Sequence, residues 1–173
     1  MIAMIRLATT DDLPTILTIY NDAIVHTTAV YGYKPHTLAQ RIAWFEEKQA
    51  AGYPVFVYEV DGVVAGFATF GPFRAWPAYK YSIEHSIYVD GTFRKRGIGA
   101  QLLQKIIEEA TAREYKTLIG GIDAANDKSI ALHEKLGFTH SGTIQNAGYK
   151  FERWLDLAFY QLDLQGPANP IEE

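Results

Sequence analysis

The stretch of residues 81–110 constrains the fold most, because it joins a strand pattern, a glycine turn and a helix pattern in that order. Residues 81–89 alternate between two faces, as expected for a strand; His85 falls with the apolar side chains and Glu84 on the other face. From residue 98 onward, apolar side chains recur at helical spacing. The sequence therefore predicts a strand–turn–helix unit at the centre of the fold.

The turn of this unit, residues 94–99, carries three basic side chains and two glycines. The first turn of a helix has unpaired N–H groups and the positive end of the helix dipole, so it attracts phosphate. Gly97 and Gly99 let a ligand approach the backbone closely. The turn lacks the Gly-Lys-Ser/Thr of a P-loop, and Leu102 replaces the third glycine of the dinucleotide fingerprint. We therefore expect a pyrophosphate cradle outside both common nucleotide-binding classes.

Length and composition favour one domain, residues 1–165, with a polar tail at residues 166–173. The formal net charge of −4 argues against nucleic acid as a partner, because binding phosphates along a strand needs a basic face. The absence of cysteine removes disulfides and thiolate metal sites, and the five histidines lack paired ligand spacing, so no metal is expected. No signal-like or membrane-spanning stretch is present, which predicts a soluble cytoplasmic protein without a membrane partner.

Periodicity and turn signals predict the remaining elements. Strands are expected at residues 2–8, 55–60, 63–70, 81–89, 116–122, 138–144 and 154–164, and helices at residues 13–24, 38–50, 98–110 and 127–136. Asp61 and Gly62 form a pair favoured in tight hairpins. The last two strands are expected to join through residues 146–149, which include Asn146 and Gly148. This order predicts an α/β domain with a mixed sheet and helices on both faces.

Two motifs of the sequence resemble those of a known superfamily. The pattern Arg94-x-x-Gly97-x-Gly99 resembles the coenzyme A signature of the GNAT superfamily of N-acetyltransferases. Asn126, followed by Ser129 and by residues 133–138, resembles a later element of the same superfamily, with a histidine at the usual tyrosine position. The resemblance implies a mostly antiparallel mixed sheet, splayed at its middle between the strand of Glu84 and the strand ending near residue 122.

Further segments resemble the phosphinothricin and methionine sulfoximine acetyltransferase branch of this superfamily. They are residues 20–23, 73–74, 83–89, 132–138 and 148–156. The resemblance implies an acetyl-CoA-dependent enzyme that acetylates the α-amine of phosphinothricin, methionine sulfoximine, methionine sulfone or a similar small amino acid. It also implies a homodimer, with residues 148–154 nearest the subunit boundary.

The resemblance also suggests residues for the acceptor site. Glu84 aligns with the general base of the branch; the alternative is a solvated glutamate on the open strand face. Arg74, beside Phe73, would clamp the acceptor carboxylate, unless it is an ordinary surface arginine. His85 is either a core histidine or, if a bulge turns it, a substrate contact. His133 would protonate the leaving thiolate or hydrogen-bond the sulfur, unless it packs at the core edge.

The coenzyme site would combine backbone and side-chain groups. The backbone of the strand would bind pantetheine and polarise the thioester, the turn would hold the diphosphate, and Asn126 would bond pantetheine amides or cap its helix. The candidates are Ile87, Tyr88, Val89, Arg94, Lys95, Arg96, Gly97, Ile98, Gly99, Ala100, Asn126 and Ser129. Two alternatives stay open: an enzyme of this superfamily with another amine acceptor, and a non-catalytic acyl-CoA sensor.

Overall fold

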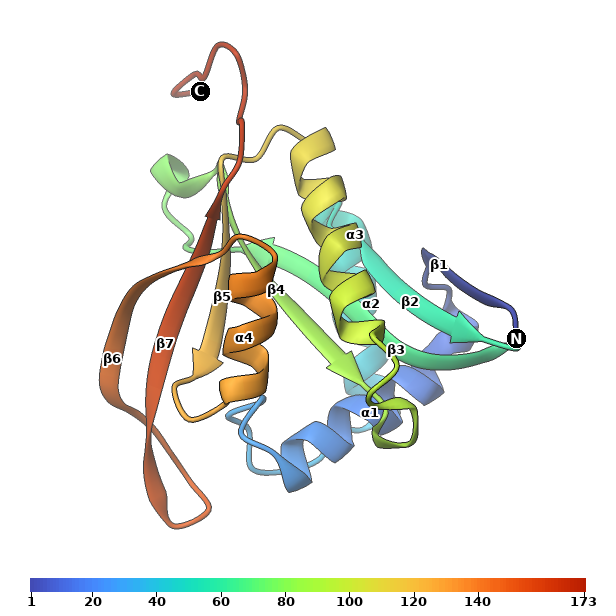
Figure 1. The fold of residues 1–173 in the computed structure, drawn as a ribbon. Helices are drawn as coiled ribbons and strands as arrows, with labels where there is room; N and C mark the ends of the chain where they lie inside the picture. Colours follow the sequence, from blue (N-terminus) through green and yellow to red (C-terminus); the bar gives the residue numbers. More distant parts are fainter. The chain divides into compact units, whose positions relative to one another are not determined.

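The computed structural model describes residues 1–173 and divides them into two compact units. The first unit comprises Met1–Phe70 and Ser86–Lys105, and the second comprises Gly71–His85 and Ile106–Glu173. Strand β4 (Ser82–Val89) and helix α3 (Ile98–Ala112) each contribute residues to both units. The elements follow the chain in the predicted order, as the colours of Figure 1 show.

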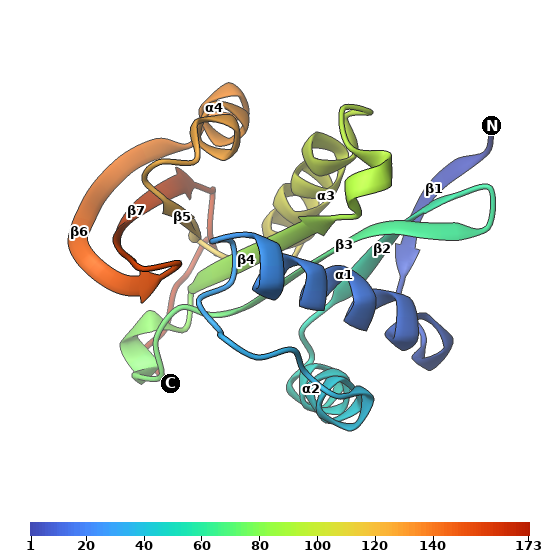
Figure 2. The ribbon, with the colours of Figure 1, turned by 90° about the horizontal axis from the view of Figure 1, so that it is seen from below.

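The first unit is built on an antiparallel sheet. Its elements are β1 (Ala3–Leu7), α1 (Leu13–His26), α2 (Leu38–Ala51), β2 (Val55–Val60), most of β3 (Val63–Pro72), the second half of β4 and the start of α3. Strand β2 pairs with β1 on one side and β3 on the other, both antiparallel. Helices α1 and α2 cover one face of this sheet, and α3 covers the other (Figure 2).

Side-chain alternation explains this sandwich. Ile16 of α1 and Phe45 of α2 share a core cluster with Val57 and Phe67 of the sheet. On the opposite face, Gly66 permits close packing, because a Cβ there would lie 2.9 Å from the Tyr88 carbonyl oxygen and 3.2 Å from Leu102 Cδ1. The predicted strand–turn–helix unit is therefore packed on the sheet through a position where only glycine fits without displacing backbone.

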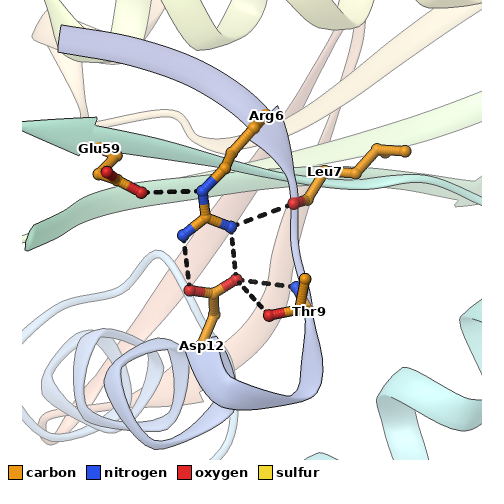
Figure 3. Close-up of polar contacts among 5 residues, drawn as sticks. All are labelled: Arg6, Leu7, Thr9, Asp12 and Glu59. Atoms are coloured by element: carbon orange, nitrogen blue, oxygen red, sulfur yellow. Dashed lines mark hydrogen bonds and ion pairs between the residues drawn. The ribbon is translucent and has the colours of Figure 1, made fainter. Parts of the chain in front are cut away.

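A partly buried ion-pair network joins β1 to the start of α1 (Figure 3). The guanidinium of Arg6 donates to both oxygens of Asp12, at 2.8 and 2.9 Å, and to Glu59 of β2 at 2.8 Å. Asp12 also accepts from the backbone N–H of Thr9 at 2.8 Å. These bonds lower the pKa of Asp12, chiefly through Arg6, and connect β1 and the start of α1 to the more distant strand β2.

The second unit contains the other half of the sheet. Its further elements are β5 (Thr117–Asp123), α4 (Asp127–Lys135), β6 (Thr139–Lys150) and β7 (Arg153–Asp163). Strand β4 pairs with β5 in parallel over a short stretch, from Ser82 opposite Thr117 to Glu84 opposite Ile119. Strand β7 then pairs antiparallel with β5 and β6. The strand order β1-β2-β3-β4-β5-β7-β6 confirms the predicted mixed, mostly antiparallel sheet.

Several helix ends follow their sequence signals. Thr37 and Gln40 form a capping box at the start of α2, and Gly52 ends that helix at a φ of 78°. Asn126 caps α4 by accepting from the Ser129 N–H at 3.2 Å, and Gly137 follows the helix at a φ of 95°. The predicted Asp61–Gly62 hairpin is also present, with both residues at positive φ.

The predicted final turn at residues 146–149 is wrong. These residues lie inside β6, where the register with β7 shifts between Ile144 and Gly148, and Asn146 adopts a φ of 53°. The chain reverses instead at Phe151 and Glu152, whose φ angles are 52° and 60°. Asparagine and glycine mark left-handed backbone in a bulge as readily as in a turn, so their presence did not locate the reversal.

Two smaller features concern the loops and the end of the chain. Strand β3 continues to Pro72, two residues beyond the predicted strand end at residue 70, and residues 77–79 form a single 3₁₀ turn. Residues 165–173 contain neither helix nor strand, but the backbone N–H of Ile171 donates to the Tyr81 hydroxyl at 3.1 Å. No helix combines the length and apolar character needed to cross a bilayer.

Candidate active site

Glu84 lies in the second unit, where strand β4 pairs with β5, and its side chain is half-buried. Its carboxylate lies over Gly121 of β5, since a Cβ at that glycine would be 3.0 Å from Glu84 Oε2. The same Cβ would lie 3.4 Å from Leu157 Cδ1 and 3.7 Å from Phe159 Cε1, both in β7. Burial raises the pKa of Glu84, and the nearby positive charge of Arg74 opposes that rise.

Arg74 and Phe73 follow the end of β3 and form an exposed cationic corner in the same unit. The Arg74 guanidinium carbon lies 4.9 Å from the centre of the Phe73 ring, within range of a cation–π contact. Phe73 also meets Phe159 edge to face, with the ring centres 6.2 Å apart. Phe159 therefore borders both the carboxylate of Glu84 and the aromatic support of Arg74.

His85 points away from Glu84 and is 7% exposed. Its Nε2 lies 2.9 Å from Nε2 of His133 in α4, and Phe138 packs against both rings. His133 is likewise buried, and its Nδ1 lies 2.7 Å from the Ser129 carbonyl oxygen. Burial lowers the pKa of both histidines, that of His85 to about 3, with a further contribution from His133. This placement supports the interpretation that both residues are histidines packed in the core.

The coenzyme signature forms an exposed cradle in the first unit. Lys95 and Gly97 adopt left-handed backbone, with φ of 65° and 73°, so the chain doubles back immediately before α3 begins at Ile98. Ile98 is buried and anchors the helix, whereas the side chains of residues 94–96 are exposed. The free N–H groups of this helix start, bordered by basic side chains, fit a diphosphate.

The other predicted coenzyme residues divide between the units. Ile87, Tyr88 and Val89 end strand β4 in the first unit. Asn126 and Ser129 belong to the second unit, where the Asn126 side-chain oxygen is occupied as the cap of α4.

Sequence reasoning missed the residues that surround the two candidate side chains. Gly121 makes room for the Glu84 carboxylate, and Gly120 does the same for the histidine rings, with His85 Cε1 at 3.0 Å and His133 Nε2 at 3.2 Å from a built Cβ. Two adjacent glycines inside a strand pattern usually mark a close approach, so this signal was available. Phe159 had no comparable signal, because its role depends on pairing between β5 and β7.

Comparison with known proteins agrees with this geometry. Residues 15–138 match the model of the acetyltransferase (GNAT) family. The chain is 42% identical to an L-methionine sulfoximine/L-methionine sulfone acetyltransferase of Salmonella typhimurium, over 96% of this chain and 97% of the relative. An N-acetyltransferase structure from Staphylococcus aureus Mu50 is 62% identical, with a TM-score of 0.95 over 95% of this chain and 100% of that one.

A second solved structure is a phosphinothricin acetyltransferase from Sinorhizobium meliloti in complex with acetyl-CoA. It is 36% identical, with a TM-score of 0.93 over 98% of this chain and 93% of that chain. The family, the enzyme class and the co-substrate predicted from the sequence are thereby confirmed. The chain belongs to the GNAT family and is an acetyltransferase with acetyl-CoA as its co-substrate.

Proposed function

We propose that this enzyme acetylates the α-amine of a small amino acid of the methionine sulfone, methionine sulfoximine or phosphinothricin type. The names of the similar acetyltransferases support this acceptor class. The observation that carries the proposal is a half-buried carboxylate, Glu84, close enough to an exposed guanidinium, Arg74, for their charges to interact. An amino acid brings one ammonium group and one carboxylate, and these two side chains complement both charges.

Glu84 acts as the general base in this proposal. An α-amino group is largely protonated at neutral pH and must lose a proton before its nitrogen can attack the thioester carbonyl. Because burial raises the pKa of Glu84, its carboxylate is a better proton acceptor than an ordinary glutamate. The proton passes from the ammonium group to Glu84, and the freed amine attacks the thioester carbonyl. The C–S bond breaks, and coenzyme A leaves as a thiolate that takes up the second proton lost by the nitrogen.

Arg74 binds the acceptor carboxylate, and the ring of Phe73 supports its guanidinium. A guanidinium presents N–H donors in a planar fork that matches the two oxygens of a carboxylate. The contact fixes the acceptor by its backbone charge and leaves its side chain free to vary, as a series of small amino-acid acceptors requires. Residues 94–100 and the end of β4 hold the coenzyme through their backbone groups.

The two histidines position the site and transfer no proton in this proposal. A carbonyl oxygen only accepts hydrogen bonds, so Nδ1 of His133 is the protonated nitrogen in its contact with Ser129. In neutral His133 the Nε2 atom is then an acceptor, and His85 Nε2–H donates to it. The only proton of His133 is therefore engaged in α4. A coenzyme A thiolate has a pKa near 8.5 and can leave with little help from an acid.

An acceptor panel tests the proposal. Thiol release from acetyl-CoA is measured with methionine sulfone, methionine sulfoximine and phosphinothricin, and with a polyamine, an aminoglycoside and a peptide N-terminus for comparison. We expect the amino acids to give the highest kcat/KM. Glu84→Gln should lower kcat by about 10²–10⁴ and leave acetyl-CoA binding intact in calorimetry. The matched control is Glu108→Gln, on the exposed side of α3.

Two results would reject this proposal. Full turnover in Glu84→Gln would show that Glu84 is not the general base. Acetyl-CoA binding without thiol release for every amine would instead favour the non-catalytic sensor.

We also propose that the enzyme is a homodimer joined through the β6–β7 hairpin. Large apolar side chains are exposed along this hairpin: Ile144 at 50%, Tyr149 at 48%, Phe151 at 50% and Trp154 at 64%. Several large apolar side chains exposed on one hairpin favour burial against a partner. The segment agrees with the predicted boundary at residues 148–154.

A further inference from the structure

A cavity of about 230 Å³ lies in the first unit, apart from the turn that holds the coenzyme signature. Helix α2 contributes Arg41, Trp44 and Lys48 to its lining, α1 contributes Tyr20, and β4 contributes Ser86. No carboxylate is among the lining residues, although two of them are cations. The cavity therefore carries an excess of positive charge and of hydrogen-bond donors.

Arg41 is the most buried charged side chain of the cavity, with 2% of its surface exposed. Its guanidinium lies between two rings, 3.9 Å from the centre of Tyr20 and 4.5 Å from that of Trp44. One terminal nitrogen donates to Nδ1 of His36 at 3.0 Å, but Nε has no hydrogen-bond partner. Arg41 takes part in none of the ion pairs of the structure.

Burying a guanidinium without a counter-ion is unfavourable, because it loses hydration that the surroundings do not replace. Burial accordingly lowers the pKa of Arg41, with Tyr20 acting in the opposite direction. The aromatic rings offset part of this cost but bring no formal negative charge. An anion bound in the cavity beside Arg41 would supply the missing counter-charge.

Lys48, about two turns further along α2, is a second cation of the cavity without a carboxylate partner. Its ammonium donates to the Phe70 carbonyl oxygen at 2.9 Å and lies 5.5 Å from the centre of the Tyr53 ring. Burial lowers the pKa of Lys48 to about 8, and no carboxylate pairs with it. One carbonyl uses one of the three ammonium donors, so two remain for a ligand.

We propose that this cavity binds a small oxyanion or oxygen-rich head group, such as a carboxylate, sulfonate, sulfone or phosphinate, between Arg41 and Lys48. Groups of this class present only hydrogen-bond acceptors, which complements a lining rich in donors. Trp44 and Phe67 provide apolar wall for a methyl or methylene group beside the oxygens. A cation would meet two like charges in the same cavity and is excluded.

The bound oxygen-rich group can come from two sources. The first is the head group of the acceptor. This source rests on the proposed function. The second is a free anion, which needs no acetyl transfer at all. The binding property itself is common to both, and it is tested first.

Titration with methanesulfonate tests the cavity directly. Calorimetry, together with the indole N–H resonance of Trp44, should show saturable binding of one methanesulfonate per chain. Arg41→Met and Lys48→Met should each weaken it by about tenfold or more, because each removes one charged donor. Lys105→Met is the control, since Lys105 belongs to the first unit but packs over Phe56, outside the cavity. Should Arg41→Met not fold, Lys48→Met decides the result, because its side chain is only partly buried.

Competition with methionine sulfone then identifies the source. Displacement of methanesulfonate by methionine sulfone assigns the cavity to the acceptor head group, and simultaneous binding assigns it to a free anion. The proposal is overturned if wild-type protein shows no saturable binding, or if both variants bind methanesulfonate as tightly as wild type. Neither result affects the proposed acetyl transfer, which the acceptor panel measures separately.

Discussion

The Nε2 atoms of His85 and His133 lie 2.9 Å apart in a buried pair that holds strand β4 against helix α4 within the second unit. The Ser129 carbonyl accepts from His133 Nδ1 and thereby fixes the direction of the bond between the two rings. Both histidines are neutral, because burial disfavours their charged forms. The pair therefore contributes stability only as long as it stays unprotonated.

This pair should make the protein less stable in mild acid. The folded-state pKa of each histidine is below its unfolded value of about 6.5, so the contribution is complete above pH ~6.5 and is lost as the pH falls. For His85 the loss should approach 1.4 kcal/mol per pH unit below that value. Urea unfolding of wild type and His85→Leu between pH 7.5 and pH 5, at roughly half-unit steps, measures it.

His85→Leu should show a shallower dependence on pH than wild type, whatever its absolute stability. The exposed His26 gives the control, because His26→Leu should retain the wild-type slope. Equal slopes for wild type and His85→Leu would show that His85 is not held neutral.

A methyl group at Gly120 should disrupt the same pair. The built Cβ lies 3.0 Å from His85 Cε1 and 3.2 Å from His133 Nε2, so both rings would have to move. We expect Gly120→Ala to lower the free energy of unfolding by about 1–3 kcal/mol. Gly142→Ala in β6 is the matched control, because nothing lies within 4 Å of its Cβ. A Gly120 variant as stable as the Gly142 variant would contradict the packing described here.

Removal of the Arg74 charge should change the pH profile of catalysis. Arg74 lowers the pKa of Glu84, which burial raises, so Arg74→Met should move the acidic limb of kcat/KM to higher pH. The KM for carboxylate-bearing acceptors should rise by about tenfold as the clamp is lost. Lys80→Met, in the same loop region, should show neither change. If Arg74→Met had the same pH profile as wild type, the charge of Arg74 would have no effect on the pKa of Glu84.

The Arg6–Asp12 network should contribute stability that acid removes. Asp12 is 7% exposed, and Asp12→Asn should lower the free energy of unfolding at neutral pH by about 1–3 kcal/mol. Because Arg6 lowers the pKa of Asp12, this contribution is complete above pH ~4 and is lost as the pH falls through the lowered pKa. Denaturant unfolding at neutral pH and near pH 3 measures the difference.

The neighbouring exposed carboxylate supplies the comparison for that experiment. Asp11→Asn should leave stability within about 0.5 kcal/mol of wild type. A wild-type advantage over Asp12→Asn that stays constant down to pH ~2 would contradict the lowered pKa.

Trp154→Glu should weaken the proposed dimer. A charge placed in an apolar interface loses hydration without gaining a partner, so the variant should sediment as a monomer at concentrations where wild type is dimeric. Trp76, which is 75% exposed, offers a tryptophan of similar exposure outside the hairpin. Trp76→Glu should leave the sedimentation coefficient unchanged. A dimer that persists in Trp154→Glu would exclude this hairpin as the interface.

Local sequence signals predicted most elements and several of their ends. The capping pair of Thr37 and Gln40 and the Asp61–Gly62 turn act through neighbours in the chain, so their outcome was readable from spacing. The turn predicted at residues 146–149 was wrong because the outcome there does not depend on neighbours in the chain alone. Whether Asn146 turns the chain or bulges it depends on the partner strand β7, which no local pattern contains.

The sequence by itself determined the family, the element order and the coenzyme signature, because these depend on short-range periodicity and on residues that act near their own place in the chain. Only the tertiary structure decided how the ionisable side chains behave. Glu84 lies over Gly121 beside Phe159, His85 pairs with His133 across 48 positions, and Arg41 is enclosed without a carboxylate. The charge state of each follows from burial and from neighbours remote in sequence, which are properties that packing creates.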